Sequence, residues 1–323
     1  MPKAVVVHAT GGPEVLRFDD VEPRTPGAGE LVVDVAAAGV NYIDTYHREG
    51  RYPLPLPFGI GLEGTGRVAA VGPDVSGFAV GDRVAWAAAQ GSYAEQVVVR
   101  AEVAVRVPDG VDDDTAGALM LQGLTAHYLV SSTYPVREGD TVLVHAAAGG
   151  VGLLLVQLAK ARGARVIGTV STDAKEALAR EAGADEVIRY DRVDFAPVVR
   201  ELTGGEGVAA AYDGVGAATF DGSLDSLRPR GFLVLFGASS GAVAPVDPLR
   251  LNKAGSVYLT RPSLVAYTAT RAELEQRARE LFAAVESGAL AVRVGGRYPL
   301  AEARRAHEDL EGRRTTGKLL LIP

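Results

Sequence analysis

The chain contains no cysteine and few histidines. Its 323 residues include only five histidines, which are scattered with no HxH or HxxxH spacing. Without cysteine, disulfides, thiolate nucleophiles and Cys-ligated zinc are all excluded. No pattern of histidines favours a metal site, so we expect none.

An excess of positive charge is also lacking. The net charge is -7, which disfavours a dedicated nucleic-acid binder or a polybasic membrane-surface protein. Hydrophobic residues make up 47% and charged residues 23%, a balance typical of globular proteins. The length favours two domains. The first residues, MPKAVVVHAT, include no long apolar segment of the secretory kind, so we expect a cytoplasmic location.

Only one uncharged run, residues 141–159, approaches the length of a membrane span. His145, Gln157 and the paired glycines at 149 and 150 interrupt it. Its first part is rich in β-branched residues, which favours a strand followed by a turn over one continuous helix. We therefore interpret the run as strand, glycine turn and buried helix, not as a membrane span.

The patterning changes along the chain. Residues 3–107 read as short strands separated by Gly-, Pro- and Asp-rich turns, which predicts a mostly β domain. From Asp140, strands alternate with helices, which predicts βαβ units and a parallel sheet. A helix after Thr270, with Glu273 completing a capping box, a second helix and a last strand, GKLLLIP, follow. We expect this tail to return to the first domain, giving ranges of 1–123, 124–260 and 261–323.

The glycine turn indicates a nucleotide site. Ala147, Gly149 and Gly152 have the spacing of G-x-G-x-x-G, with alanine first. Gly149 and Gly150 would let the backbone approach a pyrophosphate, Gly152 would let the helix pack on the strand, and the helix N-terminus would attract the anion. A tight structural turn is the alternative, but the strand before and the helix after favour a dinucleotide.

The end of the second strand favours NADPH over NADH. NADH sites usually carry an acid there, whereas residues 170–172 read Val-Ser-Thr. Lys175 follows and would pair with a 2′-phosphate. Asp173 opposes this interpretation, and Lys175 would otherwise lie on a solvated helix face.

Residues 139–160, GDTVLVHAAAGGVGLLLVQLAK, closely resemble the signature of the quinone oxidoreductase/zeta-crystallin family, which is zinc-free among the medium-chain dehydrogenases/reductases. GVNYIDTYHREG, YDGVG, FGASSG and TRPSL are similar too, in the family's order. In GIGLEGTG, Leu62 stands where zinc-dependent relatives have a histidine. The resemblance implies a doubly wound Rossmann domain, a GroES-like catalytic domain, a homodimer, and NADPH-dependent reduction of quinones, which are electrophilic enough to need no zinc.

The resemblance also implies roles for individual residues. Asn41, Tyr46 and Tyr52 would lie beside the nicotinamide, where the Asn41 amide or a tyrosine hydroxyl would donate to the developing quinol oxygen. Lys175 and Arg313 would together pair the 2′-phosphate. The full set of implied cofactor contacts is Tyr42, Thr125, Gly149, Gly150, Val151, Gly152, Ser171, Thr172, Lys175, Tyr190, Val215, Phe236, Gly237, Ser239, Ser240, Thr260, Arg261, Pro262 and Arg313.

Alternatives remain open at this point. Tyr46 and Tyr52 would also serve as packing residues, Arg261 as an ion-pair partner, and Arg313 as a helix C-terminal charge. The same fold and cofactor would serve an enone, alkenal or enoyl reductase. A protein of another class, a crystallin-like binder of nucleotide or RNA, is the third possibility. The apolar segments GFLVLFG and SVYLTRPS favour pairing of two copies at a sheet edge.

Overall fold

A computed structural model describes all 323 residues, which form two compact units. The first unit contains Met1–Leu124 and Thr270–Pro323, and the second contains Thr125–Ala269. The tail therefore completes the first unit, but it returns later than position 261. The reason is local: Tyr267 of α8 (Leu264–Tyr267) stacks on Tyr128, with ring centroids 4.3 Å apart, so this segment packs within the second unit.

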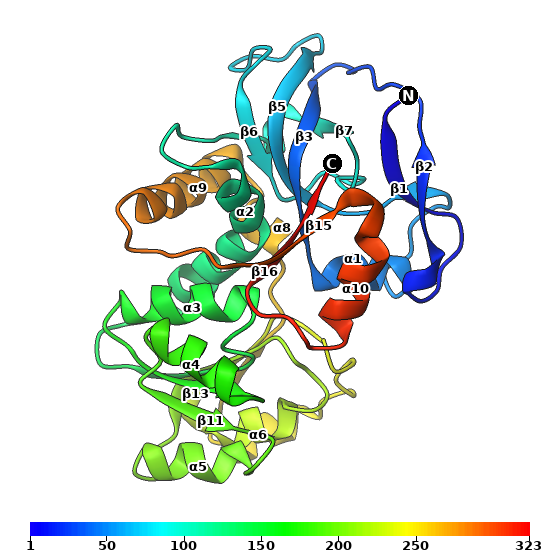
Figure 1. The fold of residues 1–323 in the computed structure, drawn as a ribbon. Helices are drawn as coiled ribbons and strands as arrows, with labels where there is room; N and C mark the ends of the chain where they lie inside the picture. The colour runs from blue at the N-terminus through cyan, green and yellow to red at the C-terminus, as the bar shows by residue number, and fades with distance from the viewer. The chain divides into compact units, whose positions relative to one another are not determined.

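The first unit is built on a seven-stranded sheet with strands from both ends of the chain. Its order is β15-β16-β3-β5-β6-β8, and β7 also pairs with β3. Figure 1 shows β16, in red, beside β3, in blue, with Leu320 opposite Gly39 in an antiparallel register. The bounds are β3 Glu30–Val40, β5 Glu63–Val71, β6 Arg83–Trp86, β7 Gln96–Arg100, β8 Val105–Arg106, β15 Val294–Pro299 and β16 Lys318–Ile322.

A smaller sheet and several helices complete this unit. The sheet has the order β2-β1-β4, with β1 Lys3–Val7, β2 Leu16–Asp20 and β4 Phe58–Gly59. The helices are η1 Pro13–Val15, α1 Tyr42–Arg48, η2 Ala101–Val103, α2 Asp113–Tyr128, which crosses the unit boundary, α9 Arg271–Glu286, η4 Leu300–Glu302 and α10 Ala303–Glu311.

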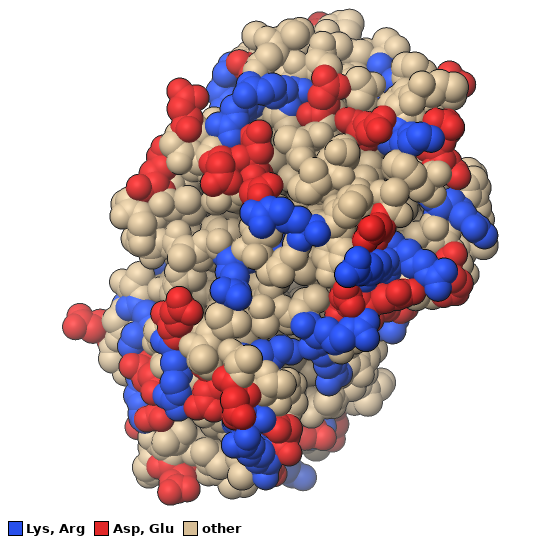
Figure 2. All heavy atoms as spheres, viewed as in Figure 1, with Lys and Arg blue, Asp and Glu red and all other residues tan.

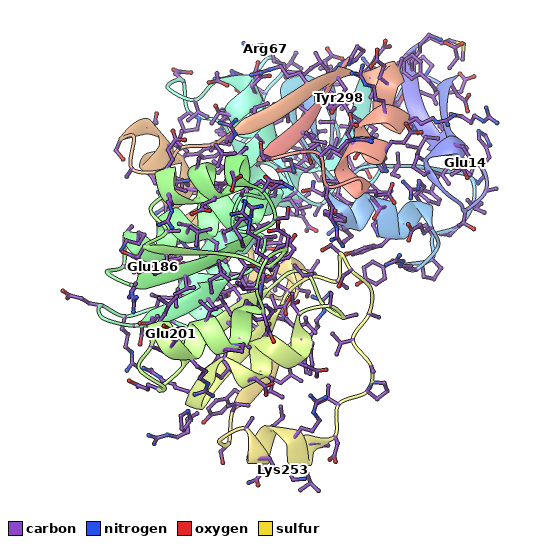
Figure 3. The ribbon with its side chains drawn as sticks, turned by 60° about the horizontal axis from the view of Figure 1, so that its bottom comes forward. Glu14, Arg67, Glu186, Glu201, Lys253 and Tyr298 are labelled. Atoms are coloured by element: carbon purple, nitrogen blue, oxygen red, sulfur yellow. The ribbon has the colours of Figure 1, made fainter.

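The predicted capping box of α9 is confirmed, because Thr270 Oγ1 accepts from the Glu273 N–H. Tyr298, labelled in Figure 3, donates to Asp309 of α10 at 2.9 Å.

The second unit has the predicted doubly wound architecture. Its six strands are all parallel, in the order β11-β10-β9-β12-β13-β14. In Figure 1, α3 and α4 lie on one side of the sheet and α5 and α6 on the other. The bounds are η3 Leu129–Thr133, β9 Thr141–Val144, α3 Gly150–Lys160, β10 Arg165–Val170, α4 Asp173–Glu181, β11 Glu186–Arg189, α5 Phe195–Leu202, β12 Val208–Asp213, α6 Phe220–Asp225, β13 Leu227–Leu235, α7 Pro248–Lys253 and β14 Tyr258–Thr260.

Each unit has its own hydrophobic core. Trp86, Leu31 and Leu319 are among the buried residues of the first, and Leu143, Phe220 and Leu233 of the second. The uncharged run is split into β9, a turn and α3, as expected, and α3 is buried over most of its surface. No helix in the structure is long and apolar enough to cross a membrane.

Candidate functional site

Asn41 lies where β3 ends and α1 begins, and its amide group is fully engaged. The side chain is buried. Its Nδ2 donates to Glu63 Oε2 at 2.8 Å and to the Gly39 carbonyl at 3.2 Å. Its Oδ1 accepts from Lys318 at 2.6 Å and from Gln122 at 3.3 Å. Both amide protons are therefore used inside the protein, and this arrangement offers none to an acceptor molecule.

A buried ion pair fixes that amide. Glu63 on β5 and Lys318 on β16 are both fully buried, and their charged groups are hydrogen-bonded to each other. Glu63 Oε1 also accepts from the Leu121 N–H in α2 at 2.7 Å. Burial lowers the pKa of Lys318, and the nearby Glu63 carboxylate opposes that shift. Lys318 was not predicted from the sequence, although a lysine at the head of the apolar strand KLLLI is a visible signal.

A second buried polar chain extends from the start of α1 to α10. Asp44 Oδ2 accepts from the Asn41 N–H and from the Tyr93 hydroxyl, both at 2.8 Å. Tyr93 lies 3.3 Å from His307 Nε2, and His307 Nδ1 accepts from Arg48 at 3.0 Å. Desolvation raises the pKa of Asp44 to about 7, whereas desolvation and the Arg48 charge lower that of His307 to about 3. None of these four residues was predicted from the sequence.

The predicted tyrosines cluster on α1 and the loop after it. The rings of Tyr46 and Tyr52 meet edge to face at 5.6 Å. Tyr46 is buried with Arg51 over its ring, whereas Tyr52 is 45% exposed and its hydroxyl makes no hydrogen bond within the protein. The Tyr42 hydroxyl donates to the Leu310 carbonyl at 3.1 Å, so it holds α10 as well. The structure therefore brings Tyr46 and Tyr52 together and leaves Tyr52 with the accessible hydroxyl.

The predicted pyrophosphate turn has the geometry that anion binding needs. Gly149 is the N-cap of α3, and no side chain caps the first turn of this helix, which begins with Gly150 and Val151. Those N–H groups are therefore open to an anion. A Cβ at Gly152 would lie 2.2 Å from the Ala146 carbonyl oxygen, so only glycine fits there. At Gly149 a Cβ would meet only that same oxygen, at 3.1 Å.

A buried network behind this turn shapes the neighbouring loop. Asp213 at the end of β12 accepts from the N–H groups of Val215 and Gly216 at 2.8 and 2.9 Å. It also accepts from Ser223, which lies 2.9 Å from His145 Nε2. Burial lowers the pKa of His145, so this histidine is neutral at physiological pH. The network places the predicted Val215, and its members were not themselves predicted.

The other predicted contacts on this edge are held by the same loops. Ser240 donates to the Val215 carbonyl at 2.8 Å, and the Ser239 N–H donates to the Gly214 carbonyl at 3.3 Å. A Cβ at Gly237 would clash with that carbonyl at 2.4 Å. Beside them, Phe236 packs on Gly214, and Thr260 pairs with Val234 in the sheet. Arg261 donates to the Leu235 carbonyl at 3.1 Å, and Pro262 follows it in the chain. The carboxyl ends of β12, β13 and β14 thus bring these residues together.

The predicted 2′-phosphate pocket lies at the ends of β10 and β11. Thr172 caps α4 by accepting from the Lys175 N–H at 3.2 Å, directly after Ser171. Tyr190 follows β11, is 42% exposed, and donates its N–H to the Val170 carbonyl. Arg313 belongs to the other unit, two residues after the end of α10, so its joint role with Lys175 stays a prediction. Thr125 is buried in α2 at the unit boundary.

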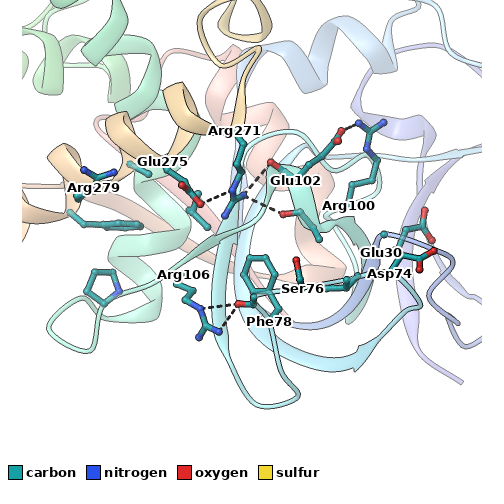
Figure 4. A pocket seen from close by; sticks show the side chains of 18 of the residues that line it. Glu30, Asp74, Ser76, Phe78, Arg100, Glu102, Arg106, Arg271, Glu275 and Arg279 are labelled. Atoms are coloured by element: carbon teal, nitrogen blue, oxygen red, sulfur yellow. Dashed lines mark hydrogen bonds and ion pairs between the residues drawn. The ribbon is translucent and has the colours of Figure 1, made fainter.

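A groove of the first unit lies elsewhere. It has a volume of about 1020 Å³ and runs between α9 and the loops at 74–78 and 100–108, as Figure 4 shows. Arg106 and Arg271 lie over the Phe78 ring and donate to carbonyls, Arg106 to that of Gly77 and Arg271 to that of Glu102. None of the predicted site residues lines this groove. No group of three or more His, Cys, Asp or Glu residues in the structure is arranged to hold a metal ion.

Family models match both units. The alcohol dehydrogenase GroES-like domain matches residues 27–109, and the zinc-binding dehydrogenase model matches residues 150–284. The chain is 49% identical to a quinone oxidoreductase of Pseudomonas aeruginosa and 46% identical to quinone oxidoreductase 1 of Escherichia coli, with full coverage of both chains in each case. It is also 42% identical to a 2-haloacrylate reductase of a Burkholderia species, over 100% of this chain and 99% of the relative.

Solved structures agree with these relatives. A mycobacterial protein complexed with NADPH matches with a TM-score of 0.97 and 57% identity, over the full length of both chains. The Escherichia coli quinone oxidoreductase complexed with NADPH also has a TM-score of 0.97, with 45% identity, covering 99% of this chain and 100% of that one.

Proposed function

Because the chain belongs to the quinone oxidoreductase family of medium-chain dehydrogenases/reductases, we propose that it reduces quinones with NADPH. The observation that carries this proposal is the full-length similarity to quinone oxidoreductases. Two of the solved structures that this chain resembles are complexes with NADPH. The residues present fit that cofactor. The uncapped first turn of α3 suits a pyrophosphate, and residues 170–172 carry no acid.

NADPH supplies the hydride when it is bound, and the chain supplies position and polarity. The loops after β12 and β13, tied together through Asp213, Val215 and Ser240, form a rigid rim at the carboxyl edge of the sheet. A quinone is electrophilic on its own. Its reduction therefore depends mainly on holding the acceptor carbon about 3–3.5 Å from the hydride donor.

We assign the acceptor contact in this proposal to Tyr52. Its half-exposed hydroxyl has no partner in the protein, so it is able to donate to the developing quinol oxygen. Asn41, whose amide protons are both engaged, instead orients the start of α1 beneath the tyrosines. The sequence alone does not distinguish the Asn41 amide from the tyrosine hydroxyls as the donor to the quinol oxygen.

The similarity to a 2-haloacrylate reductase supports a second candidate, reduction of an activated carbon–carbon double bond. Steady-state oxidation of NADPH with 1,4-benzoquinone, a naphthoquinone and an alkenal separates the two. We expect the quinones to give the higher kcat/KM. Turnover of the alkenal alone would replace the first candidate by the second, and loss of activity with a chelator, restored by zinc, would contradict zinc-independent reduction.

A homodimer belongs to the same proposal. The outer edge of β14 is unpaired, and Tyr258 on it is 54% exposed and stacks on Phe232. An exposed apolar edge of this kind favours pairing with a second copy, which sedimentation at micromolar concentration tests. A cytoplasmic location rests on the sequence alone. RNA binding is disfavoured by the net charge, and Figure 2 shows acidic and basic residues interspersed on the face in view.

A further inference from the structure

Two arginines hold the acidic side chain that opens α4. Asp173 is the first residue of this helix, and its side chain is 78% exposed. Arg189, the last residue of β11, is hydrogen-bonded to Asp173 Oδ1, and Arg192 donates to the same oxygen at 3.1 Å. The register pairs Arg189 with Val170, so both arginines are brought to the end of β10, where the 2′-phosphate pocket is proposed.

The two arginines differ in how much of their hydrogen-bonding capacity is used. Arg189 is 11% exposed; its Nε and Nη2 donate to Asp191 at 2.8 Å each, while its Nη1 donates to Asp173. Hydrogen bonding from Arg189 to Asp191 is the main reason why the pKa of Asp191 is lowered. Arg192 is 59% exposed and donates through Nη2 alone, so its Nε and Nη1 face no protein acceptor. Arg189 is therefore fixed, and Arg192 has donors to offer.

We propose that Arg192 is a specificity-determining residue for the 2′-phosphate of NADPH, with Arg189 as its support. A 2′-phosphate carries a charge of about -1.5 to -2, which an unpaired Asp173 carboxylate would repel. Arg189 and Arg192 together balance the carboxylates of Asp173 and Asp191, and Arg192 presents Nε and Nη1 to the phosphate oxygens. Asp173, whose charge by itself disfavours NADPH, thereby holds Arg192 in place to bind the phosphate. The inference rests on the proposed position of the 2′-phosphate beside Ser171, Thr172 and Lys175.

Fluorescence titration of the full-length protein with NADPH and with NADH tests this inference. We expect Arg192→Gln to raise the Kd for NADPH about fivefold to tenfold, the usual effect of losing one charged hydrogen bond, and the Kd for NADH less than twofold. Arg180→Gln is the matched control. Arg180 is exposed on α4, the helix that Asp173 opens, and is paired with Glu176, so its replacement should change neither Kd.

Lys175→Gln separates failure of the inference from failure of the pocket. If Lys175→Gln removes the preference for NADPH and Arg192→Gln does not, the role of Arg192 is overturned while the pocket stands. If neither variant changes the ratio of the two Kd values, the proposed position of the phosphate falls as well. Equal weakening of both cofactors by Arg192→Gln would also overturn the inference, and a melting curve matching the unsubstituted protein shows that the exposed residue was replaced without unfolding.

Discussion

At the scale of single residues, the most consequential feature is a charge pair in the middle of a sheet. Glu63 and Lys318 come from opposite parts of the chain and have essentially no exposure to solvent. Removing two charges from water is costly, and the pair offsets this cost only while both partners are present. The pair also satisfies the Asn41 amide and the Leu121 N–H, so it connects β3, β5, β16 and α2 at one point.

We therefore expect Lys318→Met to destabilise the protein by about 3–5 kcal/mol, because it leaves the Glu63 carboxylate buried without a partner. The double variant Glu63→Gln with Lys318→Met should be more stable than Lys318→Met alone, since no charge then remains buried. Urea denaturation of the two variants measures the difference. A double variant no more stable than Lys318→Met would show that shape, not charge, governs this position.

At the scale of elements, the turn from β9 into α3 assigns different tasks to two glycines. Gly152 lies against the backbone of the preceding turn, where a Cβ would overlap the Ala146 oxygen. Gly149 has φ -80° and ψ 173°, a conformation open to any residue, and its surroundings are less crowded. Packing therefore requires glycine at 152, whereas at 149 the requirement comes from the approach of a pyrophosphate.

The two positions should respond differently to alanine. Gly152→Ala should lower the free energy of unfolding by about 1–3 kcal/mol, as overpacking usually does. Gly149→Ala should change it by less than about 0.5 kcal/mol but weaken NADPH binding. Thermal melting and cofactor titration on both variants measure these effects. A Gly149→Ala protein that binds NADPH normally would contradict the role given to this glycine.

An element or contact could be predicted where its signal lies in neighbouring residues, and not where it depends on residues far apart in the sequence. Periodicity and glycine spacing are local, so β9, the turn, α3 and the capping box of α9 were all expected from the sequence. Glu63 and Lys318 were not, because they meet Asn41 only through long-range strand pairing, whereas Asp44 was missed although it lies three residues along the chain, in a local capping box at the start of α1. The neutralisation of Asp173 was missed because Arg189 reaches it through the parallel register of β10 and β11.

At the scale of the whole molecule, folding transfers a proton between two groups of the first unit. Near pH 5.5, the unfolded chain carries a proton on His307, with its ordinary pKa of 6.5, and none on Asp44, whose ordinary value is 3.8. In the folded protein the pKa of Asp44 is about 7 and that of His307 about 3, so the proton lies on Asp44. The two shifts act on stability in opposite directions across the same pH range.

Single substitutions should expose the two opposing effects. Relative to the unsubstituted protein, Asp44→Asn should gain stability as the pH rises from about 4 to 7, because it lacks the Asp44 proton that only the folded state keeps in that range. On the same comparison, His307→Gln should lose stability as the pH rises from about 3 to 6.5, because it lacks the His307 proton that only the unfolded state binds in that range. Each slope should approach 1.4 kcal/mol per pH unit at most. Urea midpoints across pH 4–7 measure both slopes, and parallel curves for the two variants would contradict this account.

The position of β16 between β15 and β3 has a consequence for synthesis on the ribosome. The second unit is complete once Ala269 has left the exit tunnel, so it is free to fold while translation continues. In the first unit, residues 38–40 of β3 lack the strand that pairs with them until β16 emerges. Until then, Glu63 lacks its ammonium partner, so the first unit reaches its final form only after β16 has left the ribosome.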